Sequence, residues 1–318
     1  MKPNIIVVGS ANTDMVVRVP RLPNAGETVL GGAFLKARGG KGANQAVAAA
    51  RLGADVTFIA RLGRDALGQE AAVGYQAEGI NTDYLVWDTE APSGVALILV
   101  NPEGENIIAV APGANQYLSP ADVAAAESAI AKADCVLMQL EIPVETVMTA
   151  AEIARRHKVR VILNPAPAAH LPVALLQAID LLTPNRHEAA LLAGLRDRNE
   201  ELPDFAPLQA QLRPDALLVV TLGKRGALLC ERGQPPQLFE GFTVTPMDAT
   251  GAGDAFNAAL AVGLARGWPL TEALRFANAN AAIAVTRAGA QPSLATGAEV
   301  ELFLQGLRMT PRATFEKP

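Results

Sequence analysis

The chain is poor in aromatic residues and in positive charge, and each shortage excludes a class of protein. Phe, Trp and Tyr make up only 4% of its 318 residues, so Ala, Val, Leu and Ile must build most of the core, a composition suited to parallel strands covered by helices. Its 27 Lys and Arg are outnumbered by 32 Asp and Glu, which gives a formal net charge of −5. Neither this balance nor any basic run favours a nucleic-acid partner or a membrane surface.

Long apolar runs and cysteine pairs are lacking too. No apolar run approaches the ~20 residues that a membrane span needs, and the apolar stretch near the N-terminus is too short for a signal peptide. Cys135 and Cys230 are the two cysteines, and both belong to strand-like apolar runs. We therefore expect buried free thiols with no redox or metal role, in a cytoplasmic protein that does not enter a membrane.

Short apolar runs alternate with helical patterns along most of the chain. The apolar runs lie at 5–8, 56–60, 135–140, 159–163, 180–183 and 216–221. Apolar residues at helical spacing occupy 42–52, 66–78, 119–132, 143–157 and 186–193. This alternation predicts an α/β fold with a doubly wound, mainly parallel sheet flanked by helices, and ligands at the carboxyl ends of its strands.

Two segments, 12–38 and 93–111, break this alternation because they carry strand-like runs joined by turns. The turn at 101–106 predicts a β-hairpin. We expect the two segments to form a small β lid over the ligand edge of the sheet, and its exposed apolar face favours a homodimer through the lid. Residues 1–308 are predicted to form one domain that includes this lid, followed by a C-terminal tail at 309–318.

A turn of small residues near the C-terminal third carries the most chemical information. Gly251, Ala252 and Gly253 let backbone N–H groups gather around an anion, and the helix that begins near Ala252 adds its partial positive charge. Asp254 comes next. Since phosphate repels a carboxylate, this acid is best explained as a base that takes a proton from a hydroxyl attacking phosphate. A small-residue turn also lets a helix pack close to a strand, an alternative of about equal weight for the turn alone.

Other ligand-binding motifs fit the chain less well. Phe256 occupies the third glycine position of a dinucleotide fingerprint, and Glu272, at the distance of a ribose-binding acid, opens a predicted helix. An NAD-dependent oxidoreductase is therefore disfavoured. Gly42 follows Lys41 where a Walker A motif needs Ser or Thr. A sugar-binding or regulatory protein without turnover remains an alternative, opposed by Asp254, because binding alone needs no base.

Two motifs together show a family resemblance. The sequence Gly-Gly-Lys-Gly-Ala-Asn at 39–44, with the turn at 248–254, resembles the paired signatures of the PfkB carbohydrate kinases. Further similar motifs lie at 9–14, 138–141, 164–168, 183–185, 221–223 and 284–293, in colinear order from residue 4 to about residue 307. Finer details look like the D-ribose kinases of this family.

The resemblance implies a ribokinase-like fold and a transferase that uses ATP to phosphorylate D-ribose at O5, giving D-ribose 5-phosphate and ADP. Asp254 would be the general base, and the amides of residues 251–253 the anion hole. A kinase for another small sugar or a nucleoside is the alternative. A nucleoside needs aromatic side chains to stack its base, and residues 12–40 offer only Phe34.

The resemblance also implies a sugar site that matches a ring of hydroxyls, which needs both donors and acceptors. Its residues would be Asn12, Asp14, Gly40, Lys41, Asn44, Glu141 and Asp254. Taken singly, Asn12 and Asp14 are equally explained by a turn after the first strand, and Asn44 by a helix cap. We expect them to converge because they follow strand ends or lie in the lid.

Nucleotide and cation sites are implied in the same way. The nucleotide residues would be Asn185, Glu188, Thr221, Leu222, Gly223, Lys224, Arg225, Gly226, Gly253 and Asn278. Asn185 and Glu188 would organise Mg²⁺ through waters, although their spacing is equally that of a capping box. An activating K⁺ would take oxygen ligands from Asp248, Thr250, Ala284, Arg287, Gly289 and Ser293.

Overall fold

The computed structural model describes residues 2–195 and 204–309. Of the tail predicted at 309–318, all but Met309 lies outside the described residues, and Met309 ends helix α11 (Gly297–Met309). Among the described residues, no helix is both long and apolar enough to span a membrane. Cys135 and Cys230 are buried free thiols, and burial raises their pKa values to about 12 and about 11.

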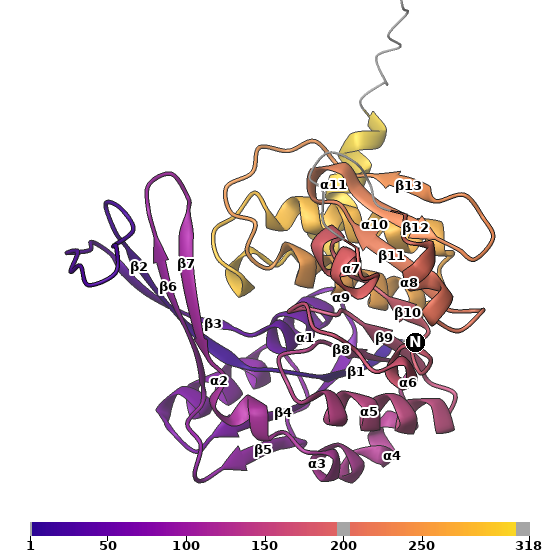
Figure 1. Ribbon diagram of the computed structural model, residues 1–318, viewed down its shortest axis with the longest axis horizontal. Helices are drawn as coiled ribbons and strands as arrows, with labels where there is room; N and C mark the ends of the chain where they lie inside the picture. Colours follow the sequence, from indigo (N-terminus) through magenta and orange to yellow (C-terminus); the bar gives the residue numbers. More distant parts are fainter. Residues whose placement is uncertain (1, 196–203, 310–318) are drawn as a thin grey trace, which may run out of the picture.

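Nine strands of the described chain form the central sheet, in the order β13-β12-β11-β10-β9-β8-β1-β4-β5 (Figure 1). They are β1 (Asn4–Val8), β4 (Asp55–Gly63), β5 (Leu85–Asp88), β8 (Cys135–Met138), β9 (Arg160–Leu163), β10 (Leu181–Leu182), β11 (Leu217–Thr221), β12 (Gly226–Cys230) and β13 (Gln237–Glu240). From β11 to β5 every pair is parallel, whereas β12 and β13 join antiparallel at one end. The predicted doubly wound, mainly parallel α/β sheet is confirmed.

Helices cover both faces of this sheet. On one face lie α1 (Lys41–Arg51), α2 (Ala66–Ala77), α9 (Ala252–Ala265), α10 (Leu270–Ala284) and α11; on the other lie α3 (Pro120–Ala125), α4 (Glu127–Ile130), α5 (Val144–Arg156), α6 (Val173–Leu176), α7 (Arg186–Leu192) and α8 (Ala206–Gln211). Alternate residues of each strand face opposite sides, so Ile5 joins the first core and Ile6 the second. The helix expected at 119–132 is divided at Ala126, whose ψ of 6° leaves the helical range.

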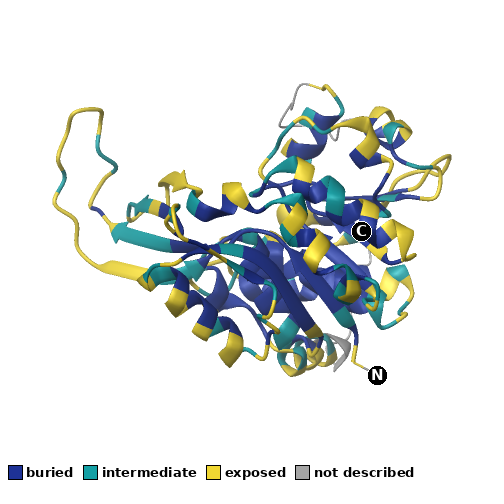
Figure 2. Cartoon of the chain, turned by 90° about the horizontal axis from the view of Figure 1, so that it is seen from below, coloured by how far each residue is buried: buried dark blue, intermediate teal, exposed yellow. Residues whose placement is uncertain are grey.

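Four strands form a second sheet in the order β3-β2-β6-β7. They are β2 (Asn12–Arg18), β3 (Phe34–Gly39), β6 (Gly94–Val100) and β7 (Asn106–Ala111), and apart from Gly39 all of their residues lie within the two segments expected to build the lid. The predicted hairpin is present as the antiparallel pair β6 and β7. This sheet projects away from the central one (Figure 1), and its outer end is exposed (Figure 2).

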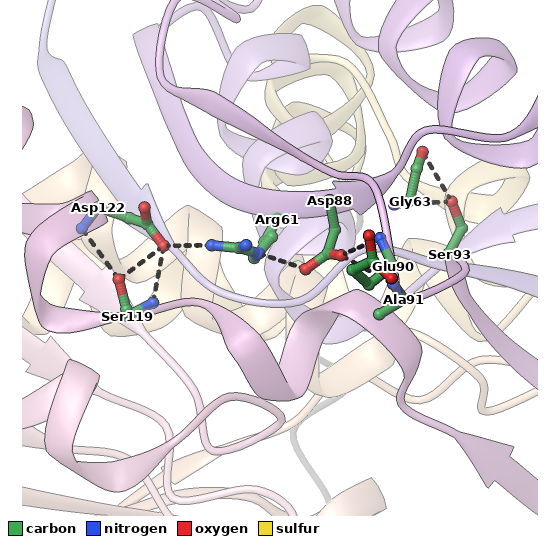
Figure 3. A network of polar contacts seen from close by, with 8 residues as sticks. All are labelled: Arg61, Gly63, Asp88, Glu90, Ala91, Ser93, Ser119 and Asp122. Carbon is green, nitrogen blue, oxygen red and sulfur yellow. Dashed lines mark hydrogen bonds and ion pairs between the residues drawn. The ribbon is translucent and has the colours of Figure 1, made fainter.

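A polar network anchors the lid where β6 begins (Figure 3). Arg61 of β4 pairs with Asp88 of β5 and with Asp122 of α3, at N–O distances of 2.7 and 3.0 Å. Ser93, just before β6, accepts a hydrogen bond of 3.1 Å from the Gly63 N–H, and its hydroxyl donates to Asp65, the N-cap of α2. These contacts tie the residue that precedes β6 to the central sheet, and thereby position the lid's inner edge.

Candidate active site

Four charged side chains meet where the lid joins the central sheet. Asp14 comes from β2, Lys41 begins α1, Glu141 follows β8, and Asp254 lies in the first turn of α9. The pKa of Asp14 is raised to about 6, mainly by burial and also by the negative charges of Glu141 and Asp254. Residues far apart in the sequence are therefore close enough to interact through their charges, as expected for one site.

Asp254 is the most enclosed of these acids, with 6% of its surface exposed. Its Oδ2 accepts a hydrogen bond of 2.9 Å from Asn44 Nδ2, and its Oδ1 one of 3.0 Å from Gln45 Nε2. Burial raises the pKa of Asp254 above its ordinary value, although the charge of Lys41 and both amides oppose the shift. The result is a held carboxylate of increased basicity, which suits a general base.

Lys41 and Glu141 are joined through the start of α1. Glu141 Oε2 accepts hydrogen bonds from the backbone N–H of Lys41 at 2.9 Å and from the hydroxyl of Ser10 at 2.5 Å. Burial lowers the pKa of Lys41, but the charges of Asp254, Glu141 and Glu188 outweigh it, so the ammonium stays protonated. Lys41 is thus a cation in an otherwise acidic site.

Gly40 allows the lid and α1 to meet. Its φ of +87° is in the left-handed region that favours glycine, and a Cβ there would lie 2.7 Å from the backbone nitrogen of Asn12. Any other residue would push the first lid strand away from the core.

The three polar residues given local alternatives have clear placements. Asn12 and Asp14 belong to strand β2, so the turn interpretation is wrong for both. The N-cap of α1 is Gly40, and no side-chain hydrogen bond caps this helix. Asn44 is therefore not a helix cap. Asn44 Oδ1 is instead buried with no hydrogen-bond partner among the described residues. A buried acceptor without a donor is costly, and a ligand hydroxyl that reached this atom would remove the cost.

The small-residue turn has the conformation expected of an anion site. Gly251 has φ +79° and caps α9, and a Cβ there would lie 3.1 Å from Ala290 Cα. Within the described chain, the N–H groups of Gly251 and Gly253 have no hydrogen-bond partner, whereas that of Ala252 donates to the Ala249 carbonyl at 3.2 Å. Two of the three expected amides are therefore free to bind an anion beside Asp254. The Ala252 amide can join them only if its hydrogen bond to the Ala249 carbonyl breaks.

A buried polar network below Asp254 was missed by the sequence reasoning. Gln45 Nε2 also lies 3.2 Å from Asn164 Oδ1, and Asn257 Nδ2 donates to the Gly253 carbonyl at 2.8 Å. Thr183 links the two ends because it bonds both Asn164 and Asn257, and Gln139 is attached at one end, where it donates to Gln45 Oε1. The sequence carried one indication of this network, because Gln45 and Asn257 lie in helices of small apolar residues. A buried amide in such a helix is costly unless it is paired.

Asn185 and Glu188 form the capping box named as their alternative. Glu188 N–H donates to Asn185 Oδ1 at 2.9 Å, and Asn185 N–H donates to Glu188 Oε2 at 2.7 Å. Burial raises the pKa of Glu188, opposed by the Asn185 N–H and by the charge of Lys41. The capping box uses Glu188 Oε2 and leaves Glu188 Oε1 without a hydrogen bond in the described chain. Glu188 also interacts with the charges of Lys41 and Asp254. A water-mediated Mg²⁺ role therefore fits these residues.

The remaining nucleotide residues lie at the next strand ends. Residues 221–226 connect β11 to β12 through the 3₁₀ helix η2 (Gly223–Arg225), and a bridge pairs Thr221 with Asn185. Asn278 Nδ2 donates to the carbonyls of Phe239 and Glu240 at 3.0 and 3.2 Å. Its amide nitrogen therefore ties α10 to β13, and only its oxygen is left for a nucleotide.

Two loops that were expected to hold K⁺ are joined directly. Asp248 Oδ1 accepts from Thr250 N–H at 2.9 Å, and its Oδ2 accepts from Gly289 N–H at 2.8 Å. Burial raises the pKa of Asp248, but these hydrogen bonds outweigh it and hold the pKa below its usual value. The Ser293 hydroxyl donates to the Ala290 carbonyl. The residues expected at this site offer a carboxylate, hydroxyls and backbone carbonyls, an all-oxygen donor set of the kind that suits an alkali cation.

Residues 2–297 match the family model described as the pfkB family carbohydrate kinase. The chain belongs to the PfkB family of carbohydrate kinases. Curated relatives of this PfkB chain include ribokinases of Haemophilus influenzae, 41% identical over 305 residues, and of Bacillus subtilis, 44% identical over 301 residues. The alignments cover 96% and 95% of this chain and 99% of each relative.

Solved structures agree with this family assignment. A ribokinase of Arabidopsis thaliana complexed with ribose and ATP is 34% identical with a TM-score of 0.86, and the match covers 96% of this PfkB chain and 99% of that one. A ribokinase of Thermotoga maritima, also 34% identical, has a TM-score of 0.85 over 96% of this chain and 100% of its own. The ribokinase-like fold expected from the motifs is confirmed.

Proposed function

We propose that this PfkB chain transfers the γ-phosphoryl group of ATP to O5 of D-ribose, giving D-ribose 5-phosphate and ADP. One observation carries the proposal: Asp254, held by Asn44 and Gln45, lies beside the unbonded amides of Gly251 and Gly253 at the N-terminus of α9. A binding protein has no need of a buried base next to an anion site. The names of the full-length relatives support ribose as the acceptor and ATP as the donor.

Proton transfer and charge stabilisation divide between neighbouring groups. Asp254 takes the proton of the 5-hydroxyl as that oxygen attacks phosphorus. The amides of Gly251 and Gly253, with the positive end of α9, stabilise the charge that spreads over the transferred group, and Ala252 joins them when its N–H leaves Ala249. The hydrogen bonds from Asn44 and Gln45 keep the carboxylate oriented toward the reacting hydroxyl.

The sugar is held by complementary hydrogen-bonding groups. Asp14 and Glu141 accept from hydroxyls, Lys41 donates, and Asn12 and Asn44 each present one end of an amide. Gly40 allows the close approach of backbone and ligand. This set serves a small polyhydroxylated substrate without any apolar surface for a base.

Two metal ions are part of the proposal. Asn185 and Glu188 would hold Mg²⁺ through waters beside the ATP phosphates, whose negative charge the ion neutralises when bound. The remaining nucleotide contacts would come from residues 221–226, Gly253 and the Asn278 oxygen. Asp248, Thr250, Ala284, Arg287, Gly289 and Ser293 would hold K⁺ and keep the adjoining anion turn in shape, with Arg287 contributing only backbone because its side chain pairs with Glu299.

We further propose a cytoplasmic homodimer that associates through the lid. Every residue of β7 is exposed, and its apolar side chains Ile107, Ile108 and Val110 are each about half exposed. An open strand edge with apolar side chains favours pairing with a second copy. In this proposal residues 1–308 make one domain per subunit, with the tail outside it.

Another sugar is the second candidate, because a deoxyribokinase of Salmonella typhi is 35% identical to this chain. A coupled assay of ADP release against pentoses, hexoses, deoxy sugars and nucleosides tests both, with phosphorus NMR to locate the phosphate. D-ribose is expected to give the highest kcat/KM and a 5-phosphate. A higher value for another sugar or a nucleoside would transfer the assignment to that substrate, and no ADP release with any acceptor would overturn it.

A further inference from the structure

Asn115, a residue outside the sugar site, is bonded to one of the site's side chains. It lies in the 3₁₀ helix η1 (Gly113–Tyr117), just after the lid, and only 1% of its surface is exposed. Its Oδ1 accepts the Ala11 N–H at 2.8 Å, while its Nδ2 lies 3.1 Å from the Ala11 carbonyl and 2.9 Å from the Pro112 carbonyl. Because backbone donors and acceptors are not interchangeable, these contacts determine the orientation of the Asn115 amide.

That orientation determines the orientation of Asn12. The Nδ2 of Asn115 also donates to Asn12 Oδ1 at 2.8 Å. Turning the Asn12 amide over would set two NH₂ groups against each other, so its oxygen is committed to Asn115. Gly94 makes room for this contact, since a Cβ there would lie 2.2 Å from Asn12 Oδ1 and 2.3 Å from Asn115 Nδ2.

The other end of the Asn12 amide faces the proposed sugar site. Asn12 and Asp14 are two residues apart on β2 and therefore point to the same face of the lid sheet, the face on which Asp14 senses the charges of Glu141 and Asp254. In the described chain, Asn12 Nδ2 has no hydrogen-bond partner and is not one of the sealed polar atoms. It is a donor available to a ligand.

We infer that Asn115 is a specificity-determining positioning residue: it makes Asn12 present a hydrogen-bond donor, and thereby makes the site require an oxygen on the sugar at that position. Asn44 is held in the opposite sense, because its Nδ2 is committed to Asp254 and its Oδ1 is sealed from the surface without a donor among the described residues. A sugar with hydrogen in place of the hydroxyl at Asn12 leaves that donor unpaired, which corresponds to roughly 5- to 150-fold in affinity.

The inference rests on the proposed sugar kinase function, so its test measures binding and not turnover. D-ribose, 2-deoxy-D-ribose and 3-deoxy-D-ribose are titrated calorimetrically into wild type, Asn115→Ala and the matched control Gln116→Ala, which removes an exposed amide from the same 3₁₀ helix. Wild type and Gln116→Ala should bind one deoxy sugar at least fivefold more weakly than D-ribose. In Asn115→Ala that ratio should fall toward unity, because the Asn12 amide is free to turn away from an unpaired position.

A second variant keeps the test independent of how well Asn115→Ala folds. Asn12→Leu keeps the approximate volume of the side chain but presents neither a donor nor an acceptor to the sugar. It should lose the same discrimination, and adding it to Asn115→Ala should change the ratio little further. Equal loss of affinity for all three sugars in Asn115→Ala, or unchanged discrimination in Asn12→Leu, would overturn the inference.

The outcomes separate this inference from the proposed function. A wild type that discriminates between the sugars but releases no ADP with any of them leaves the role of Asn115 intact and removes the kinase assignment. If wild type phosphorylates D-ribose but Asn115→Ala discriminates between the sugars as wild type does, the kinase assignment stands and the proposed role of Asn115 is removed. A wild type that binds none of the three sugars overturns both.

Discussion

Gln45 Nε2 donates to Asp254 Oδ1 at 3.0 Å, joining the second helical turn after the lid to the first turn of α9, 209 residues later. With Asn44 on the other carboxylate oxygen, the proposed base is held from both sides. Both bonds favour the charged form of the acid, and burial opposes it. The proposed reactivity of Asp254 therefore depends on residues of the N-terminal motif as much as on its own turn.

Removing the base should abolish most turnover. Asp254→Asn is expected to lower kcat by roughly 10² to 10⁴ with the fold intact, the usual scale for loss of a general base. Circular dichroism and the ADP-release assay together check this. Asp215→Asn, at an exposed position, is the control and should be fully active. Near-normal turnover by Asp254→Asn would show that the assignment of the base is wrong.

Removing one of the two hydrogen bonds to Asp254 should change the pH dependence of kcat/KM. Gln45→Met keeps the length of the side chain but removes a donor that stabilises the carboxylate, so the pKa of Asp254 rises further and the acidic limb of kcat/KM moves to higher pH. At pH 6 the rate should fall about tenfold or more, with partial recovery at pH 9. Gln76→Met, on the exposed face of α2, should leave the profile unchanged. A uniform loss at every pH would point to misfolding instead.

Asp14 should cost the ligand-free protein stability at neutral pH. Its pKa is about 6 in the fold against an ordinary value of 3.8, so the penalty is absent below pH 4, where both the folded and unfolded states are protonated, and complete above pH 6, where both are ionised. Asp14→Asn should raise the free energy of unfolding by about 1 to 2 kcal/mol at pH 8, allowing for partial exposure, and by little at pH 4. Urea denaturation at both pH values measures this, with Asp83→Asn as the exposed control. A gain of equal size at both pH values would contradict the linkage.

The proposed cation site should make turnover depend on K⁺. Replacing K⁺ with Na⁺ at constant ionic strength is expected to reduce kcat severalfold, because the smaller ion fits a carbonyl-lined site less well. Asp248→Asn, which removes the only carboxylate of the set, should reduce activity in K⁺ and abolish the difference between the two salts. Choline chloride gives the ion-free baseline. Equal rates in all three salts would argue against the site.

Lid association should respond to a charge on its exposed edge. Ile108→Asp places a carboxylate on β7, where burial against a second copy would be costly. Light scattering should then report a monomer, while Asn106→Asp at the exposed start of the same strand should remain a dimer. A wild type that is already monomeric at micromolar concentration would refute the proposed interface.

The sequence predicted helices and turns correctly wherever a pattern is periodic or a turn is restricted to small residues. The helix expected at 42–52 is Lys41–Arg51, and α9 begins at Ala252 as the turn chemistry indicated. The capping box of Asn185 and Glu188 was also foreseen as one alternative. Such features depend on neighbours within a few residues, so no knowledge of distant contacts is needed to find them.

Residues whose role comes from distant partners were not found in this way. Asn115 has no local peculiarity, yet it contacts Ala11 and Asn12 across more than 100 positions. In the sequence, Gln45 is one residue of an Ala-rich helix, and only the fold brings Asp254 and Asn164 within hydrogen-bonding distance of it. Asn278 was expected to contact a nucleotide, but its amide nitrogen holds β13. Hydrogen bonds between segments remote in sequence leave no periodic signature.

By itself the amino-acid sequence determined the alternation of strands and helices, the two sheets and the identity of the acid beside the anion turn, because periodicity, small residues and charge act locally. Only the tertiary structure decided which end of each amide faces the site, which of the turn's N–H groups is free, and which residues hold Asp254. The reason is that a side chain's donor or acceptor role depends on the partner opposite it, and folding alone brings that partner into contact.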